Sequence, residues 1–200
     1  MQSDLKWTRQ CEKVTSEINY AISVLSRLRD HLDRKELRVI ADGLVMSKLR
    51  YCLPVYTAES LRFHESDPQS SALQRLQVAQ NDMLRVVNRK RRRDHVRISE
   101  MLESTNFLSV NQMSAYGLLI ELWKAHQFGV PVLGDLFKRE RNDDRTLRSD
   151  SSQRVVAAGN DSFTMNCARL YNMTSTKFRT TNLLKVAKSE ARVLVKSLPI

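Results

Sequence analysis

The chain has few residues that break helices and few that form disulfides. Its 200 residues include 5 Gly and 4 Pro, so long uninterrupted helices are permitted. The cysteines Cys11, Cys52 and Cys167 lie far apart and are odd in number, which argues against a disulfide framework and for a reducing compartment. No apolar run approaches the roughly 20 residues that span a bilayer, and no N-terminal run has the pattern of a secretory leader. We therefore expect an intracellular chain, in the nucleus or the cytoplasm, with no membrane partner.

Residues arranged for catalysis are also scarce. Four histidines are scattered along the chain, and none has a cysteine or a second histidine at zinc-ligand spacing. The adjacent acids Asp143 and Asp144 lie in a polar stretch, whereas two-metal chemistry needs carboxylates held by rigid elements. There is no glycine-rich phosphate loop and no nucleophile with an evident base. We therefore expect no catalytic residue, no metal site and no cofactor.

Positive charge is the strongest bulk property of the sequence. There are 33 Lys and Arg residues against 22 Asp and Glu, which gives a net charge of +11 and a pI near 9.9. Lys and Arg displace condensed counterions from phosphates, so this excess favours binding to a polyanion with little sequence preference. A solvated basic surface without a partner is the alternative.

Apolar residues near the start of the chain recur at steps of four and three. They are Trp7, Cys11, Val14, Ile18, Ala21, Leu25, Leu28 and Leu32. This spacing predicts one long amphipathic helix with a heptad seam, which a partner helix must cover. Asp33 and Glu36 form a capping pair that opens a second helix. Pro54 marks the end of that helix, and Gly43 inside it indicates a close approach of another helix. We expect the two helices to form an antiparallel hairpin.

Helical periodicity returns after a polar connection from Thr57 to Ser71. Gln80 falls where the next seam expects an apolar residue, either as a surface amide or as a buried, hydrogen-bonded residue that fixes helix register. Ser109 and Gln112 form a capping box for a further helix, whose Trp123 we interpret as a core residue more readily than as a base-stacking one. Residues 131–160 read as a polar linker. The pattern predicts an all-α fold, an antiparallel helical bundle with a basic loop and a smaller C-terminal helical lobe.

Two groups of cations are candidate phosphate-binding sites. The first comprises Arg85, Arg89, Lys90, Arg91, Arg92, Arg93 and Arg97, five of them consecutive. Self-repulsion disfavours close packing of such a run, so we expect it at a helix end or in a loop that faces phosphate; a nuclear-localisation signal or a solvated turn are the alternatives. The second group comprises Lys185, Lys188 and Arg192 in the last helix. An ordinary solvated helix or a membrane-surface helix are the alternatives there.

Several short strings occur in the order in which one known family has them. They are Leu5-Lys6-Trp7 with Cys11-Glu12-Lys13; Ser47-Lys48-Leu49-Arg50-Tyr51-Cys52 with Leu53-Pro54-Val55; Leu73-Gln74-Arg75-Leu76-Gln77; Gln80-Asn81-Asp82-Met83-Leu84-Arg85; Leu108-Ser109-Val110-Asn111-Gln112; Trp123-Lys124-Ala125; Phe163; Ala168-Arg169-Leu170-Tyr171-Asn172; and Lys196-Ser197-Leu198-Pro199-Ile200. The strings span nearly the whole chain. In them the chain resembles the stretch behind the reverse transcriptase palm in the polyproteins of jockey-like and CR1-like non-LTR (LINE-type) retrotransposons.

The sequence pattern divides the chain into a helical lobe in residues 1–130, a polar flexible linker in 131–160 and a basic C-terminal helical segment in 161–200. The resemblance implies that these parts correspond to the thumb and to the helical C-terminal extension of the family. It implies that these parts grip template RNA or the primer-template duplex by its phosphates. The endonuclease and the palm with its catalytic aspartates would lie upstream in the same polyprotein and could be partners. We therefore expect a non-catalytic fragment of an RNA-directed DNA polymerase. The alternatives are a protein-interaction module that pairs through the seam of residues 7–32, a standalone enzyme, or a transposon relic without function.

Overall fold

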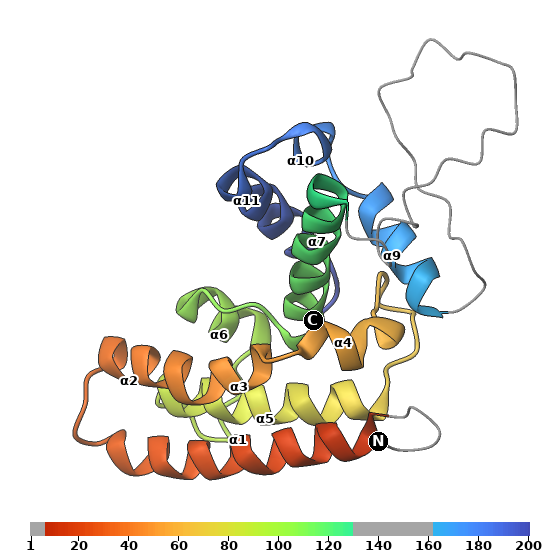
Figure 1. The fold of residues 1–200 in the computed structure, drawn as a ribbon. Helices are drawn as coiled ribbons and strands as arrows, with labels where there is room; N and C mark the ends of the chain where they lie inside the picture. Colours follow the sequence, from red (N-terminus) through yellow and green to blue (C-terminus); the bar gives the residue numbers. More distant parts are fainter. Residues whose placement is uncertain (1–6, 130–161) are drawn as a thin grey trace, which may run out of the picture.

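The structure, a computed structural model, describes residues 7–129 and 162–200 (Figure 1). All regular secondary structure in these ranges is helical and none is strand, which confirms the prediction of an all-α fold. Helix α1 (Thr8–Leu28) is followed by a reversal of the chain, and α2 (Arg34–Ala41), the π-helical turn η1 (Asp42–Met46) and α3 (Ser47–Arg50) return along it. The predicted antiparallel hairpin is therefore present.

The remaining elements pack along this hairpin or across it. They are α4 (Leu53–Thr57), the 3₁₀ turn η2 (Ala58–Ser60), α5 (Ser71–Val87), α6 (Ile98–Thr105), α7 (Val110–Phe128), α9 (Ser162–Asn172), α10 (Thr176–Thr180) and α11 (Leu184–Val195). Helix α5 packs along α1, and α7 runs across the direction of both, with α9 and α11 against it (Figure 1). The predicted linker, 131–160, lies outside the described residues, so the division into two lobes stays a prediction.

The heptad seam of α1 is covered by the chain itself. Cys11, Ile18 and Leu25 are almost completely buried, and α5 and the returning α2–α3 segment pack on this helix. Buried residues of the C-terminal helices, such as Leu170 and Phe178, belong to the same hydrophobic core. Burying such side chains contributes about 1.5–3 kcal/mol each before entropy is counted. The seam therefore closes an intramolecular core.

Both predicted capping boxes are confirmed. The Asp33 carboxylate accepts the Glu36 backbone N–H at 2.8 Å, and the Glu36 carboxylate accepts the Asp33 N–H at 2.8 Å. Ser109 and Gln112 make the same reciprocal pair at the start of α7. Each box satisfies N–H groups that the first helical turn leaves without a partner. The two boxes fix where α2 and α7 begin.

Polar side chains inside the core connect α5 to α7. Gln80 is fully buried and donates to the Leu108 carbonyl at 2.7 Å, which confirms its interpretation as a buried, hydrogen-bonded residue. Its neighbour Gln77 accepts the Val110 N–H at 2.9 Å. Trp123 is buried, as expected of a core residue, and its indole N–H donates to the Thr181 carbonyl at 3.0 Å. These bonds fix the position of α7 relative to α5 and to the segment before α11.

Two predictions about helix boundaries and packing are wrong. The second helix ends at Arg50 because Tyr51 is extended, with ψ of 112°. Cys52 then takes a left-handed conformation, with φ of 52°, and Pro54 lies in the first turn of α4. Proline is well suited to a first turn, which needs no N–H from it. Gly43 is exposed and a Cβ there would meet nothing within 4 Å. The close approach is at Gly117 instead, where a Cβ would lie 2.5 Å from Cγ of Pro54.

Candidate nucleic-acid interface

The basic run lies in the loop between α5 and α6, residues 88–97, which we call the cationic loop. Helix α5 ends because Arg89 takes a left-handed conformation, with φ of 55°. The backbone N–H of Lys90 then donates to the Arg85 carbonyl at 2.8 Å, closing the last turn of the helix. Further on, the Asp94 carboxylate accepts the Arg91 N–H at 2.8 Å. The loop has a defined shape that its own residues impose.

Three of the predicted phosphate-binding cations are engaged in the fold. The Arg89 guanidinium donates to the carbonyl oxygens of Arg29 and Leu32, at 3.1 and 2.6 Å, and so ties the loop to the end of α1. Arg92 pairs with Asp82 at 2.7 Å, and this hydrogen bond and charge raise the pKa of Arg92. Arg85 lies 3.5 Å from the same carboxylate. In the sequence these residues are equivalent to their neighbours, because spacing alone does not show which cations meet a carbonyl or an acid.

The other four cations of this group project from the loop. Lys90, Arg91, Arg93 and Arg97 are exposed, and the structure shows no side-chain hydrogen bond or ion pair from any of them to another residue in 7–129 or 162–200. Three acids lie near these cations in the sequence, and none pairs with them in 7–129 or 162–200: Asp82 pairs with Arg92, Asp94 accepts a backbone N–H, and Glu100 forms no ion pair. None of these four side chains is therefore paired with an acid within the described chain.

The second predicted group lies on one face of α11. Lys185, Lys188 and Arg192 are three, four and seven positions apart, the spacing of neighbours on a helix face. Lys185 and Lys188 are exposed. Arg192 is half-buried and donates to the carbonyl and the side-chain oxygen of Asn106, at 2.9 and 3.0 Å. The structure thus brings the group together on a single face, but only Arg192 reaches the rest of the molecule.

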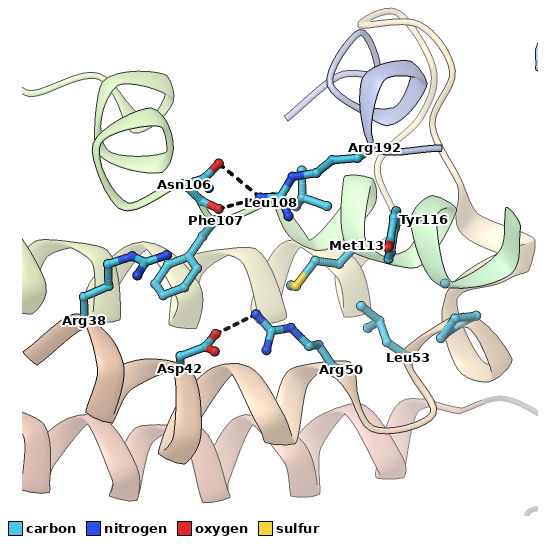
Figure 2. A pocket seen from close by; sticks show the side chains of 12 residues that line it. Arg38, Asp42, Arg50, Leu53, Asn106, Phe107, Leu108, Met113, Tyr116 and Arg192 are labelled. Carbon is cyan, nitrogen blue, oxygen red and sulfur yellow. Dashed lines mark hydrogen bonds and ion pairs between the residues drawn. The ribbon is translucent and has the colours of Figure 1, made fainter. Parts of the chain in front are cut away.

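Arg192 opens onto a pocket of about 480 Å³ between α2–α3, the connection from α6 to α7, and α11 (Figure 2). Two further arginines line it. Arg38 donates from Nε to the Thr105 carbonyl at 2.6 Å, and its guanidinium lies 5.4 Å from the centre of the Phe107 ring. Arg50 pairs with Asp42 at 2.6 Å. The sequence does not reveal this pocket, since its cations come from three separate elements.

The π-helical turn explains part of the pocket's geometry. A π-turn takes an additional residue compared with an α-turn, and such turns occur often at functional sites. The additional residue in η1 brings Arg50, eight positions after Asp42, onto the side of the helix where a residue seven positions away would otherwise lie. Asn106 shapes the opposite wall: it ends α6 in a left-handed conformation, with φ of 55°, for which asparagine is favoured. Asn106 at the end of α6 is therefore the only local feature of the sequence that indicates part of this pocket wall.

Helix α2 connects the cationic loop to the pocket. Arg34 donates to the Asn88 side chain at the start of the loop, and Arg38, four residues further along α2, lines the pocket. Residues four apart lie on the same side of a helix. The cations of the loop, of α2 and of the pocket therefore follow one another over the surface.

The described residues hold neither a metal cluster nor a membrane-spanning helix. Within 7–129 and 162–200 no three His, Cys, Asp or Glu side chains come together in a way that could hold a metal ion. None of the helices in these ranges combines the length and apolarity that a membrane crossing requires.

Comparison of the chain with family models, with curated proteins and with solved structures finds no match.

Proposed function

We propose that this chain binds RNA or DNA by its phosphates, as a non-catalytic helical segment of the kind that follows the palm in non-LTR retrotransposon reverse transcriptases. The observation that carries the proposal is the cationic loop. Lys90, Arg91, Arg93 and Arg97 project into solvent without an acidic partner among the described residues. Unpaired cations at this density gain free energy when they replace the counterions condensed on a nucleic acid.

The fold favours phosphate binding by the loop over a merely solvated basic turn. Arg89 and Arg92 anchor the loop to α1 and α5, so the remaining cations are presented by a shaped loop. A site that is already ordered loses less conformational entropy on binding than a disordered basic tail. Lys185 and Lys188 on α11 add a second group of exposed charge, which would extend the contact along a strand.

The protein-interaction alternative lacks the surface it requires. It depends on the seam of residues 7–32 pairing with another chain, but most of that seam is buried under α5 and the α2–α3 segment. Only Trp7 at one end of the seam is substantially exposed. Pairing through this seam would require the described core to open.

Fluorescence anisotropy with a labelled single-stranded RNA and with an RNA–DNA hybrid tests the proposal. At about 50 mM salt the wild-type chain binds both, and binding weakens steeply by about 200 mM. The double variant Arg91→Gln with Arg93→Gln binds more weakly, because it removes two cations whose side chains make no hydrogen bond or ion pair within the described fold.

The matched control is Arg9→Gln with Lys13→Gln, which removes the same charge. Both residues are exposed on the first turns of α1, and Lys13 lies roughly 20 Å along this helix from its end at Leu28, beside the loop. The control variant retains wild-type affinity. No binding at low salt, or an equal loss in both double variants, would overturn the proposal.

A further inference from the structure

The pocket beside Arg192 is lined by three arginines and by apolar side chains. Figure 2 shows Arg192 with Asn106 on one side, the Asp42–Arg50 pair on the opposite side, and Met113, Tyr116 and Leu53 gathered at one end. Its volume of about 480 Å³ is in the range of small-molecule and cofactor sites. The residues that surround it are otherwise well packed, and Phe107, Leu108 and Met113 are buried.

Two of the three guanidinium groups in the pocket form no ion pair with a carboxylate among the described residues. Arg38 and Arg192 are held by a carbonyl or an amide oxygen, not by a carboxylate. Each keeps N–H groups for which no described residue is an acceptor: both terminal nitrogens of Arg38, and Nε and Nη1 of Arg192. Only Arg50 has an acidic partner, Asp42. In each group one nitrogen is held by a hydrogen bond and the other two have N–H groups left to donate. Such a group is suited to a phosphate, which accepts two parallel N–H bonds.

The apolar end of the pocket is suited to a flat ring. Leu53, Pro54 and Met113 line it together with Tyr116. Partial burial raises the pKa of the Tyr116 hydroxyl, although the charge of Arg192 acts in the opposite direction, so this hydroxyl stays protonated at neutral pH and can donate a hydrogen bond. Unpaired bases in single strands are recognised in this way, by apolar or planar surfaces with a few polar groups.

We propose that the pocket receives one unpaired nucleotide, with its phosphate on Arg38 and Arg192. Its base lies against the apolar end, and Asp42 limits affinity by occupying Arg50. The proposal rests on the proposed nucleic-acid binding, since Arg34 and α2 connect the pocket to the cationic loop. The nucleotide can belong to a bound strand or be a free mononucleotide, and the two sources share this chemistry.

The decisive variant is Asp42→Asn, because it predicts a gain. It releases Arg50 to the ligand, so binding of a short labelled single-stranded RNA tightens several-fold. The Asp42–Arg50 pair is about half exposed, and such pairs contribute little to stability. A matched control is Glu17→Gln, which removes the acid of another partly exposed pair, with Lys48 at 3.3 Å. Both variants add one positive charge to the chain, but Glu17 does not line the pocket.

Arg192→Gln gives the opposite result and weakens binding by about tenfold, the size of effect expected for one charge-assisted contact. Arg192→Lys, which keeps the charge but not the two-pronged geometry, recovers part of the affinity. Thermal unfolding of each variant checks that the lower affinity for RNA does not come from unfolding of the chain. Titration with AMP then distinguishes the sources: AMP that binds, and tightens in Asp42→Asn, identifies a free-nucleotide site, whereas response to the RNA alone identifies a nucleotide within a strand.

The outcomes separate this inference from the proposed function. Salt-dependent RNA binding that the cationic-loop variant weakens, with Asp42→Asn and Glu17→Gln giving the same affinity, overturns the pocket and leaves the proposed function standing. Absence of RNA binding in every variant overturns the proposed function, and absence of AMP binding in the same samples overturns the pocket as well.

Discussion

Neighbouring arginines of the cationic loop have different roles, which the hydrogen bonds of each side chain show. The Arg89 side chain donates to two carbonyls beyond the end of α1, whereas the side chains of Arg91 and Arg93 form no hydrogen bond or ion pair with another described residue. Five consecutive cations look alike in the sequence, because which of them meets a carbonyl depends on where the end of α1 lies. The run was predictable as a candidate site, but the division between anchoring and exposed cations was not.

Arg89→Ala is expected to lower the free energy of unfolding by about 1 kcal/mol, since it leaves two carbonyl oxygens without their donor. Arg91→Ala is the control and should stay within about 0.5 kcal/mol of wild type, because its exposed side chain makes no hydrogen bond or ion pair with another described residue. Urea denaturation measures both. Equal stability of the two variants would show that Arg89 does not anchor the loop.

Tyr56 has a buried hydroxyl with no hydrogen-bond partner among the described residues, and burial raises its pKa well above the ordinary value. Tyr56→Phe removes this unsatisfied group and is expected to leave the free energy of unfolding unchanged or to raise it by about 1 kcal/mol. Thr57→Val is the contrast, because the buried Thr57 hydroxyl bonds to the Leu53 carbonyl and to Ser114, each at 2.6 Å.

Thr57→Val should lower the free energy of unfolding by about 1–3 kcal/mol. Thermal unfolding of the two single variants, compared under one condition, checks the pair. If Tyr56→Phe cost as much as Thr57→Val, the Tyr56 hydroxyl must have a partner.

At the scale of elements, the sequence predicts those features that depend on residues close together in one helix. The capping boxes at Asp33 and Ser109 and the seam of α1 follow from spacing within one helix, and each was found where it was expected. The π-helical turn Asp42–Met46 has no such local signature. The extended Tyr51 and the left-handed Cys52 have no local signature either, because cysteine does not favour that conformation, so the sequence predicts an end at Pro54, after the observed end at Arg50.

The close approach that the sequence predicted at Gly43 is found at Gly117 in α7 instead. Gly117→Ala places a methyl group 2.5 Å from Pro54, so it is expected to lower the free energy of unfolding by about 1–3 kcal/mol through overpacking. Gly43→Ala meets nothing within 4 Å and should raise the free energy of unfolding by about 0.5–1 kcal/mol, since alanine loses less backbone entropy in a helix.

Differential scanning calorimetry of the two variants measures the contrast. A stabilising Gly117→Ala would mean that α4 and α7 are less closely packed than the distance between Pro54 and Gly117 requires. A destabilising Gly43→Ala would mean that a neighbour covers η1.

At the scale of the whole molecule, net charge was predictable but its arrangement was not. A charge of +11 indicates a polyanionic partner from composition alone. The pocket could not be anticipated, because Arg38, Arg50 and Arg192 come together only when the C-terminal helix packs beside the α6–α7 connection. The surfaces that matter for binding arise from packing between distant segments, for which a single sequence offers no periodicity to read.

The salt dependence of RNA binding tests the central claim most directly. Each phosphate contact contributes about 0.7 to the slope of log affinity against log salt for a single strand, so losing two contacts reduces the slope by about 1.4. We expect this reduction for Arg91→Gln with Arg93→Gln, and an unchanged slope for Arg9→Gln with Lys13→Gln. Slopes that fall equally in both double variants, or in neither, would contradict the claim that the cationic loop binds the phosphates.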